Sequence, residues 1–496
     1  MTAYTRTATT PAMRQRATRQ EDDNEGLERG LHARHVMMLA VGGSIGVGLF
    51  MGTGTGIALA GPSLILAYAC VGLIIFLVMR SLGELLMYRV VPGGFADYAR
   101  EFLGPAFGFV TSWGYWITWS LIGMSELTVV AQITHGWLPN VPQWAIVGVS
   151  LAALVLLNLA KVGVFGEAEF WFASIKVAAI IVVVALGVVV CVTHAGAAGA
   201  DAGLANLFAV SAPSGASGFF PYGLWGFLMG LKVAVFSYQG SELIGMSAAE
   251  AEDAEHVLPR AINAVPARIL LFYVCSLAAM MSVVPWTGFS ADRSPFIQTL
   301  DAIGVPVAST VMGAVVITSA LSSCSSGALY SNARLLMRMA HNGIAPRAFA
   351  SVSGSHVPAN GVFASAAMMV LGVVLNAIVP ERVFSYLMSI CTIAALWTWG
   401  VIIVCGMVYR RRVACGEAKE SSFPMPHATA ASVLCLAFFA MVVVIMAFDP
   451  DSRMALAGIP LWGVVLMAGY RIHLARGAKR GADMMETSDN VAAEIE

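Results

Sequence analysis

Long apolar stretches separated by short polar segments dominate this chain. Each stretch holds roughly the 17 to 25 residues that a helix needs to cross a bilayer. The pattern therefore predicts an all-α integral membrane protein with twelve transmembrane helices. The predicted spans cover residues 36–60, 63–88, 105–135, 144–160, 169–194, 222–249, 266–285, 306–332, 358–378, 383–409, 427–448 and 454–474.

The positions of the basic residues support this count. Lys and Arg in short loops favour the cytoplasmic side of a membrane. If the chain starts inside, 24 of its 28 Lys and Arg residues fall on that side or at adjoining span ends, and only Arg293, Arg382 and Arg453 fall outside. The remaining residue, Lys232, lies within a span and is expected to face water near the outer side. Both termini are therefore predicted to be cytoplasmic.

Two spans contain residues that do not suit a continuous helix. The first includes residues 42–48 (GGSIGVG), and seven glycines fall between Gly42 and Gly56. Each glycine inside a helix costs up to about 1 kcal/mol relative to alanine. The sixth span includes the polar residues 237–242 (SYQGSE). We expect both helices to open at these points and to line a binding site, because free backbone groups inside a membrane need protein or water to cover them. Close helix packing is the alternative role for the glycines.

These interruptions hold the same place in two successive groups of five spans, and the charge distribution makes the two spans face opposite ways. The arrangement indicates a 5+5 inverted repeat with discontinuous helices 1 and 6, a site near the middle of the membrane and two additional C-terminal helices. The predicted divisions are a disordered cytoplasmic tail (1–34), a first five-helix repeat (35–194), an extracytoplasmic loop (195–221), a second five-helix repeat (222–412), helices 11 and 12 (413–475) and a cytoplasmic C-terminal tail (476–496).

Composition excludes several other classes of protein. Hydrophobic residues make up 58% of the chain and charged residues 11%, and the net charge is −1, so a nucleic acid is not an expected partner but membrane lipid is. The eight cysteines lack CxxC spacing, and the histidines form no HExxH motif. The sequence therefore predicts no metal, no cofactor and no enzymatic activity.

Several motifs resemble those of amino acid permeases of the amino acid–polyamine–organocation superfamily, within the bacterial amino acid transporter family. In chain order, they are residues 35–50 (HVMMLAVGGSIGVGLF), 59–62 (LAGP), 83–85 (GEL), 166–172 (GEAEFWF) with Lys176, 237–242 (SYQGSE), 248–250 (AAE) and 259–262 (PRAI). Four stretches are similar to permeases for D-serine, D-alanine and glycine: residues 49–52, 78–80, 261–263 and 281–283. Residues 237–240, in contrast, look more like those of asparagine permeases.

This resemblance implies a proton-coupled symporter in a bacterial cytoplasmic (inner) membrane that imports small neutral amino acids by alternating access. D-Alanine, D-serine, glycine or a similar amino acid is the expected substrate. The alternatives are asparagine or another neutral amino acid, and a sodium-coupled symporter or exchanger on the same scaffold. By the resemblance, the first break holds the α-carboxylate and the sixth-span break holds the α-ammonium. The implied substrate-binding residues are Gly43, Ser44, Ile45, Gly46, Gly48, Tyr238, Gln239, Gly240 and Ser241.

Ionisable residues inside spans are the candidates for proton coupling. A charge in the middle of a span costs at least ~2.5–3.5 kcal/mol, so it needs a partner or a function. Glu126 and Glu242 are expected to take up and release protons, with a structural role as the alternative for each. By the resemblance, Lys176 stands where sodium-coupled relatives hold a sodium ion; we expect its positive charge to replace that ion and its protonation to change during transport. Snorkelling of its side chain to the interface is the alternative. Glu84 is expected to have a structural role near the cytoplasmic interface.

Three more residues are candidates for lining the pocket: Trp119, Ser322 and Ser323. Helical spacing places hydroxyls of the eighth span on one face, where they either line the cavity or pack against neighbouring helices. In the sodium-coupled alternative, these hydroxyls would bind the ion and would compete with Lys176 for that role.

Overall fold

The structure, a computed structural model, describes residues 45–91, 94–160, 162–212, 215, 218–247, 254–354 and 357–495. Within these ranges, all regular secondary structure is helical and there is no strand. Eight helical segments are long and apolar enough to cross a membrane, and two shorter apolar helices accompany them. The prediction of a helical membrane protein is therefore confirmed.

The helices are η1 (Gly48–Gly52), α3 (Thr53–Ala60), η2 (Gly61–Ser63), α4 (Leu64–Tyr88), α5 (Phe95–Leu103), α6 (Pro105–Trp137), α7 (Gln143–Asn158), α8 (Val162–Thr193), η3 (Gly199–Asp201), η4 (Leu204–Leu207), α9 (Gly223–Ser237), α10 (Leu243–Ser247), α11 (Ala254–Asn263), α12 (Val265–Arg268), η6 (Ile269–Cys275), α13 (Ser276–Val283), η7 (Trp286–Gly288), α14 (Pro295–Ile303), α15 (Pro306–Ser323), η8 (Cys324–Ser331), α16 (Asn332–His341), η9 (Arg347–Ala350), α17 (Ala359–Ile378), α18 (Val383–Ala414), α19 (Ala428–Met446) and α20 (Pro450–Ile495).

Glycine and proline set several of these helix boundaries. Gly104, with φ 102°, precedes Pro105, which is the first residue of α6. Proline suits this position because the N–H that it lacks would have no partner within the helix. Gly304 ends α14 in the left-handed conformation, with φ 87°.

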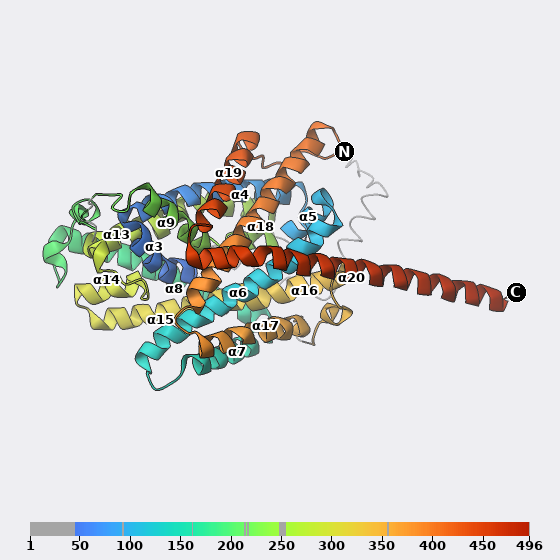
Figure 1. Cartoon of the computed structure of the whole chain (residues 1–496), viewed down its shortest axis with the longest axis horizontal. Helices are drawn as coiled ribbons and strands as arrows, with labels where there is room; N and C mark the ends of the chain where they lie inside the picture. Colours follow the sequence, from blue (N-terminus) through green and yellow to red (C-terminus); the bar gives the residue numbers. More distant parts are fainter. Residues whose placement is uncertain are drawn as a thin grey trace, which may run out of the picture.

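The long helices form a bundle in which they run roughly side by side (Figure 1). The helices α6, α7, α15 and α17 lie along one side, and α4, α9, α18 and α19 lie along the other. The two groups meet where α18 packs against α6. The last helix, α20, crosses the bundle.

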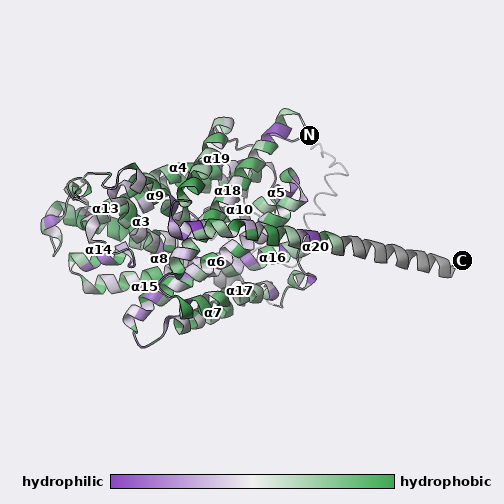
Figure 2. Ribbon diagram, in the orientation of Figure 1, coloured by the Kyte–Doolittle hydropathy of each residue, from purple (hydrophilic) through white to green (hydrophobic). Residues whose placement is uncertain are grey.

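Hydrophobic residues occupy much of the helical bundle (Figure 2), and many large apolar side chains are exposed. Val192 is 73% exposed, and Val149 and Leu156 are each 72% exposed. Monomeric soluble proteins rarely show large contiguous apolar surfaces of this kind, whereas contact with lipid accounts for them. The exposed apolar surface thus supports the membrane assignment independently of sequence hydropathy.

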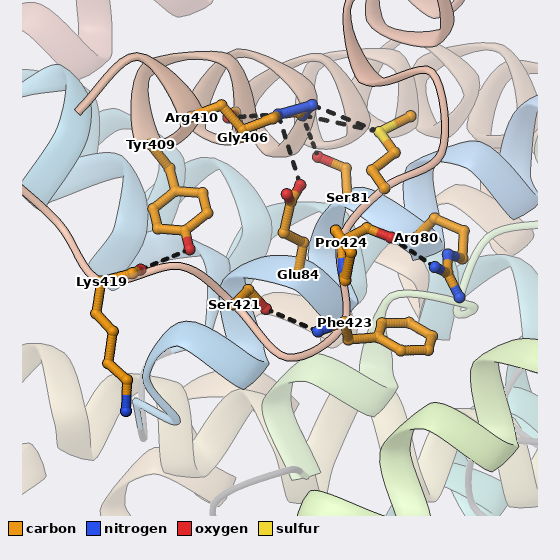
Figure 3. Close-up of polar contacts among 11 residues, drawn as sticks. Arg80, Ser81, Glu84, Gly406, Tyr409, Arg410, Lys419, Ser421, Phe423 and Pro424 are labelled. Atoms are coloured by element: carbon orange, nitrogen blue, oxygen red, sulfur yellow. Dashed lines mark hydrogen bonds and ion pairs between the residues drawn. The ribbon is translucent and has the colours of Figure 1, made fainter. Parts of the chain in front are cut away.

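Arginines gather at one end of the bundle, at the ends of α4, α16 and α18; we call this the arginine-rich end. There, Nε of Arg410 lies 3.5 Å from Oε2 of Glu84. Arg80 donates a 2.6 Å hydrogen bond to the carbonyl of Pro424 and lies over the ring of Phe423 (Figure 3). These contacts fasten the loop between α18 and α19 to α4 and agree with the structural role expected of Glu84.

Lys232 does not face water, contrary to the expectation from its sequence position. Its side chain is only 6% exposed, and its Nζ lies 2.5 Å from Oδ2 of Asp449 and 3.2 Å from Oγ of Ser452. The ion pair ties α9 to the start of α20. The sequence pattern did not indicate this pairing because the two partners are 217 residues apart.

Candidate functional site

The sixth predicted span is interrupted where the sequence indicates. Helix α9 ends at Ser237 and α10 begins at Leu243, with turns between them. Gly240 has φ 93°, a conformation that residues with a Cβ rarely adopt. The polar segment that the apolar pattern singled out is therefore a true break in the helix.

The side chains of this break make bonds within the protein. The Tyr238 hydroxyl donates to the carbonyl of Tyr68 at 3.0 Å, and Nε2 of Gln239 donates to the carbonyl of Cys391 at 2.6 Å. The Ser241 hydroxyl donates to the carbonyl of Tyr238 at 2.9 Å. Because these side-chain donors are engaged, they hold the shape of the break.

The described part of the first predicted span begins just before a helix. Gly43 and Ser44, two of the predicted substrate-binding residues, lie outside the described residues. Ile45 and Gly46 are not helical, and the carbonyl of Gly46 accepts hydrogen bonds from the N–H groups of Leu49 and Phe50. The carbonyl of Ile45 accepts a 3.2 Å hydrogen bond from the Ser319 hydroxyl.

The first and sixth predicted spans touch where the sixth is broken. The Ser237 hydroxyl donates to the carbonyl of Gly48 at 2.7 Å. A Cβ on Gly48 would lie 2.5 Å from Cα of Ser237, so only glycine allows this approach. Gly48 therefore has a packing role in addition to any role in binding.

Three ionisable side chains meet beside this contact. Glu126 comes from α6, whereas Glu169 and Lys176 come from α8; their exposures are 2%, 3% and 0%. Lys176 interacts electrostatically with both carboxylates. Since its side chain is fully buried, Lys176 does not snorkel to the interface. We refer to these three residues as the Lys176 cluster.

Two adjacent serines of α15 hold the two carboxylates. The Ser322 hydroxyl lies 2.9 and 2.8 Å from the two carboxylate oxygens of Glu169. The Ser323 hydroxyl and the backbone of Val47 form hydrogen bonds with Glu126. A Cβ on Gly46 would lie only 2.6 Å from Oε1 of Glu126, so the cluster directly adjoins the first predicted break. Ser322 and Ser323 thus contact the cluster itself.

Glu242, at the end of the sixth-span break, has a different environment. It accepts hydrogen bonds from the Tyr115 hydroxyl at 3.3 Å and from Nε1 of Trp399 at 3.2 Å. The Trp119 ring packs against Gly327 and lies edge-to-face against the Tyr115 ring. Glu242 therefore links the break to α6 and α18 through neutral donors.

Sequence reasoning missed Glu169, although its motif was noted. Glu169 and Lys176 are seven residues apart, a spacing that puts both on one face of a helix. This spacing was the available signal. A separate cavity of about 80 Å³ lies at the arginine-rich end, lined by residues of α5, α6 and α20, and none of the predicted site residues belongs to it.

Comparison with known proteins gives a consistent result. A model of the amino acid permease family matches residues 35–479. The chain is 41% identical over 453 residues to the amino-acid permease AapA of Bacillus subtilis, covering 91% of this chain and 96% of that one. It is 40% identical over 466 residues to the D-serine/D-alanine/glycine transporter of Escherichia coli K12, covering 93% and 96% of the two chains. It is 38% identical over 471 residues to the L-asparagine permease of Salmonella typhimurium, covering 94% and 93%.

The family match spans nearly the whole helical bundle, and these relatives align over almost their full lengths. The chain therefore belongs to the amino acid permease family and is a membrane transporter rather than an enzyme.

Proposed function

We propose that this permease is a proton-coupled symporter that imports small neutral amino acids, with D-alanine, D-serine and glycine as the leading substrates. The observation that carries the proposal is the contact between the first and sixth predicted spans, at Gly48 and Ser237, beside the buried Lys176 cluster. Such an arrangement would bring a substrate site and a proton site together. Twelve spans in a 5+5 inverted repeat, with both termini in the cytoplasm of a bacterial cell, complete the proposal.

Polar groups near the two breaks suit a zwitterion. In the described part of the chain, Oε2 of Glu126 and Oε1 of Gln239 are buried without a hydrogen-bond partner. Buried polar atoms rarely lack hydrogen-bond partners, so a polar ligand bound in this region would supply the missing partner. The substrate carboxylate would bind free N–H groups at Gly43, Ser44, Ile45, Gly46 and Gly48, and its ammonium would bind carbonyls of Tyr238, Gln239, Gly240 and Ser241.

Coupling would arise at the Lys176 cluster, with Glu242 as a further candidate for protonation. Differential binding of the proton and the substrate to inward-facing and outward-facing states makes such coupling possible. The buried position of Lys176 favours protons over sodium, because an ammonium already stands among the oxygens that an ion would need. The hydroxyls of Ser319, Ser322 and Ser323 are likewise engaged with the backbone or with a carboxylate.

The identity of the transported amino acid is the more specific part of the proposal. The E. coli relative is named for D-serine, D-alanine and glycine, whereas the Salmonella relative is named for L-asparagine, at nearly the same identity. Permeation of L-asparagine or another neutral amino acid is therefore the second candidate.

Transport by the purified protein in sodium-free proteoliposomes tests both parts. We expect an inward proton gradient to drive accumulation of radiolabelled D-alanine, and unlabelled D-serine and glycine to compete with it more strongly than L-asparagine. Accumulation that requires sodium would overturn the coupling proposal, and competition by L-asparagine alone would overturn the substrate proposal.

A further inference from the structure

The Lys176 cluster contains more acids than bases. Glu126 and Glu169 both face Lys176, and all three side chains are buried. The described residues of α7, α13, α15, α17 and η8, which pack against α6 or α8, include no Lys, Arg or His. Among the described residues, the thiols of Cys324 and Cys391 also interact with Glu126. If all three members of the cluster were ionised, it would hold one net negative charge.

Charged residues on other elements pair elsewhere: Arg410 of α18 pairs with Glu84, and Lys232 of α9 pairs with Asp449. On α5 and α16, charged side chains lie at the arginine-rich end, where Arg338 pairs with Asp97. Glu242 faces Tyr115 and Trp399 instead. An uncompensated charge in a dry interior is strongly unfavourable, and binding one proton removes that charge. Two carboxylates that compete for one ammonium therefore tend to share a proton between them.

The two carboxylates differ in what they contact. Glu126 bonds to the Val47 backbone next to the first predicted break, and its second oxygen has no hydrogen-bond partner among the described residues. Both oxygens of Glu169 lie within hydrogen-bond distance of the Ser322 hydroxyl. One acid thus adjoins the first predicted break, whereas the other is held by Ser322 of α15.

We propose that Glu169 is a second proton-carrying carboxylate and that Glu126 and Glu169 share the transported proton across Lys176. In one facing state, a proton from water forms an O–H bond with one carboxylate, and the other carboxylate stays paired with the Lys176 ammonium. In the opposite state, this O–H bond breaks and the proton leaves to water on the other side. Lys176 remains an ammonium throughout. This inference rests on the proposed proton-coupled function and identifies which groups carry the proton.

Replacing Glu169 with glutamine is the direct test. In Glu169→Gln, Glu126 and Lys176 form a neutral pair that no longer needs a proton. We expect proton-driven accumulation of D-alanine to be lost, while counterflow exchange of D-alanine persists. In the wild type, the half-saturating D-alanine concentration for exchange should change by up to about tenfold per pH unit, as linkage to one proton requires. In the variant, it should be independent of pH.

Matched variants separate this role from a merely structural one. Glu167→Gln alters an acid two residues away that accepts a bond from Nε1 of Trp171, and it should leave the pH profile unchanged. Glu169→Asp keeps the charge and should keep the pH dependence. Ser322→Ala removes the hydroxyl that holds Glu169 and should shift the midpoint of the profile without abolishing it.

The outcomes distinguish this inference from the proposed function. Accumulation of D-alanine by the wild type that does not depend on the proton gradient would contradict the proposed function. A Glu169→Gln protein with wild-type accumulation and pH profile would overturn the inference alone. If Glu169→Gln loses exchange as well, the Glu169→Asp variant is decisive. Accumulation that depends on pH in Glu169→Asp supports the inference, and the absence of such accumulation overturns it.

Discussion

The glutamates of the Lys176 cluster and Glu84 all lie within membrane-spanning helices, but the residues around them differ. Glu84 interacts with two arginines, Arg80 and Arg410, and the Arg410 side chain is 20% exposed. The arginines also bond to backbone carbonyls of Pro424 and Gly406 (Figure 3). In the Lys176 cluster, two acids face one base, and none of them reaches water.

This difference distinguishes a structural contact from a site that would bind a proton. At the arginine-rich end, two arginines face Glu84, and Arg80 also binds the loop between α18 and α19. In the Lys176 cluster, one negative charge remains unbalanced, which gives a proton a reason to bind. The depth of an acid in the membrane is thus less informative than the ratio of acids to bases around it.

The largest effect is expected from removing the base of the Lys176 cluster. Lys176→Ala leaves two carboxylates buried together, and loss of one partner from a buried ion pair destabilises a protein by about 3–5 kcal/mol. Concentrative uptake should be abolished, whereas exchange should be less affected. Thermal unfolding and proteoliposome uptake measure the two effects. Unaltered proton-driven accumulation would show that Lys176 is not part of coupling.

The second-largest effect is expected from enlarging Gly48, which contacts Ser237 beside the Lys176 cluster. In Gly48→Ala, the new methyl group would meet the backbone of Ser237 at 2.5 Å, and such overpacking costs about 1–3 kcal/mol. Separation of the two spans should also weaken D-alanine binding, as measured by counterflow exchange. Gly114→Ala, in an open part of α6, is the matched control and should be neutral or slightly stabilising. Equal behaviour of the two variants would refute the packing role of Gly48.

The ion pair between Lys232 and Asp449 lies outside the Lys176 cluster and the arginine-rich end. It is expected to make a pH-dependent contribution to stability. Burial raises the pKa of Asp449, but the hydrogen bonds from Lys232 and Ser452 and the Lys232 charge outweigh it, so the pKa is lower than usual. A lowered pKa means that the stabilisation is complete above the ordinary aspartate pKa of about 4 and is lost as the pH falls through the folded-state value.

The variant Asp449→Asn tests this contribution. The thermal stability of the wild type should exceed that of the variant at neutral pH, and the difference should shrink as the pH falls below about 4. A constant difference across this range would contradict the assignment, because an uncharged contact does not titrate.

The smallest effect is expected at the arginine-rich end. Arg80→Lys weakens the contact with the Phe423 ring and the hydrogen bond to Pro424, at about 0.5–1 kcal/mol for an exposed cation–π pair. A slightly lower melting temperature should accompany an unchanged ratio of accumulated D-alanine to proton gradient. A change in that ratio would mean that the two regions are not functionally separate.

The sequence predicted the features that are local to one helix. The helical class follows from apolar length, and the break after Ser237 follows from polar residues inside an apolar span. The burial of Glu126 agrees with its position inside a span, whereas Lys176 lies about two turns into its span, where the sequence left snorkelling open. Pairings across the bundle were not predictable, because periodicity describes one helix at a time. Asp449 as the partner of Lys232, Ser322 as the partner of Glu169 and Pro424 as the partner of Arg80 all depend on how distant segments pack.

Simultaneous recording of lumenal pH and D-alanine uptake in sodium-free proteoliposomes tests the central claim most directly. We predict that adding D-alanine outside acidifies the lumen of vesicles that contain the wild-type protein, and that vesicles with the Glu126→Gln variant exchange D-alanine without this acidification. Uptake by the wild type without any change in lumenal pH would contradict the account.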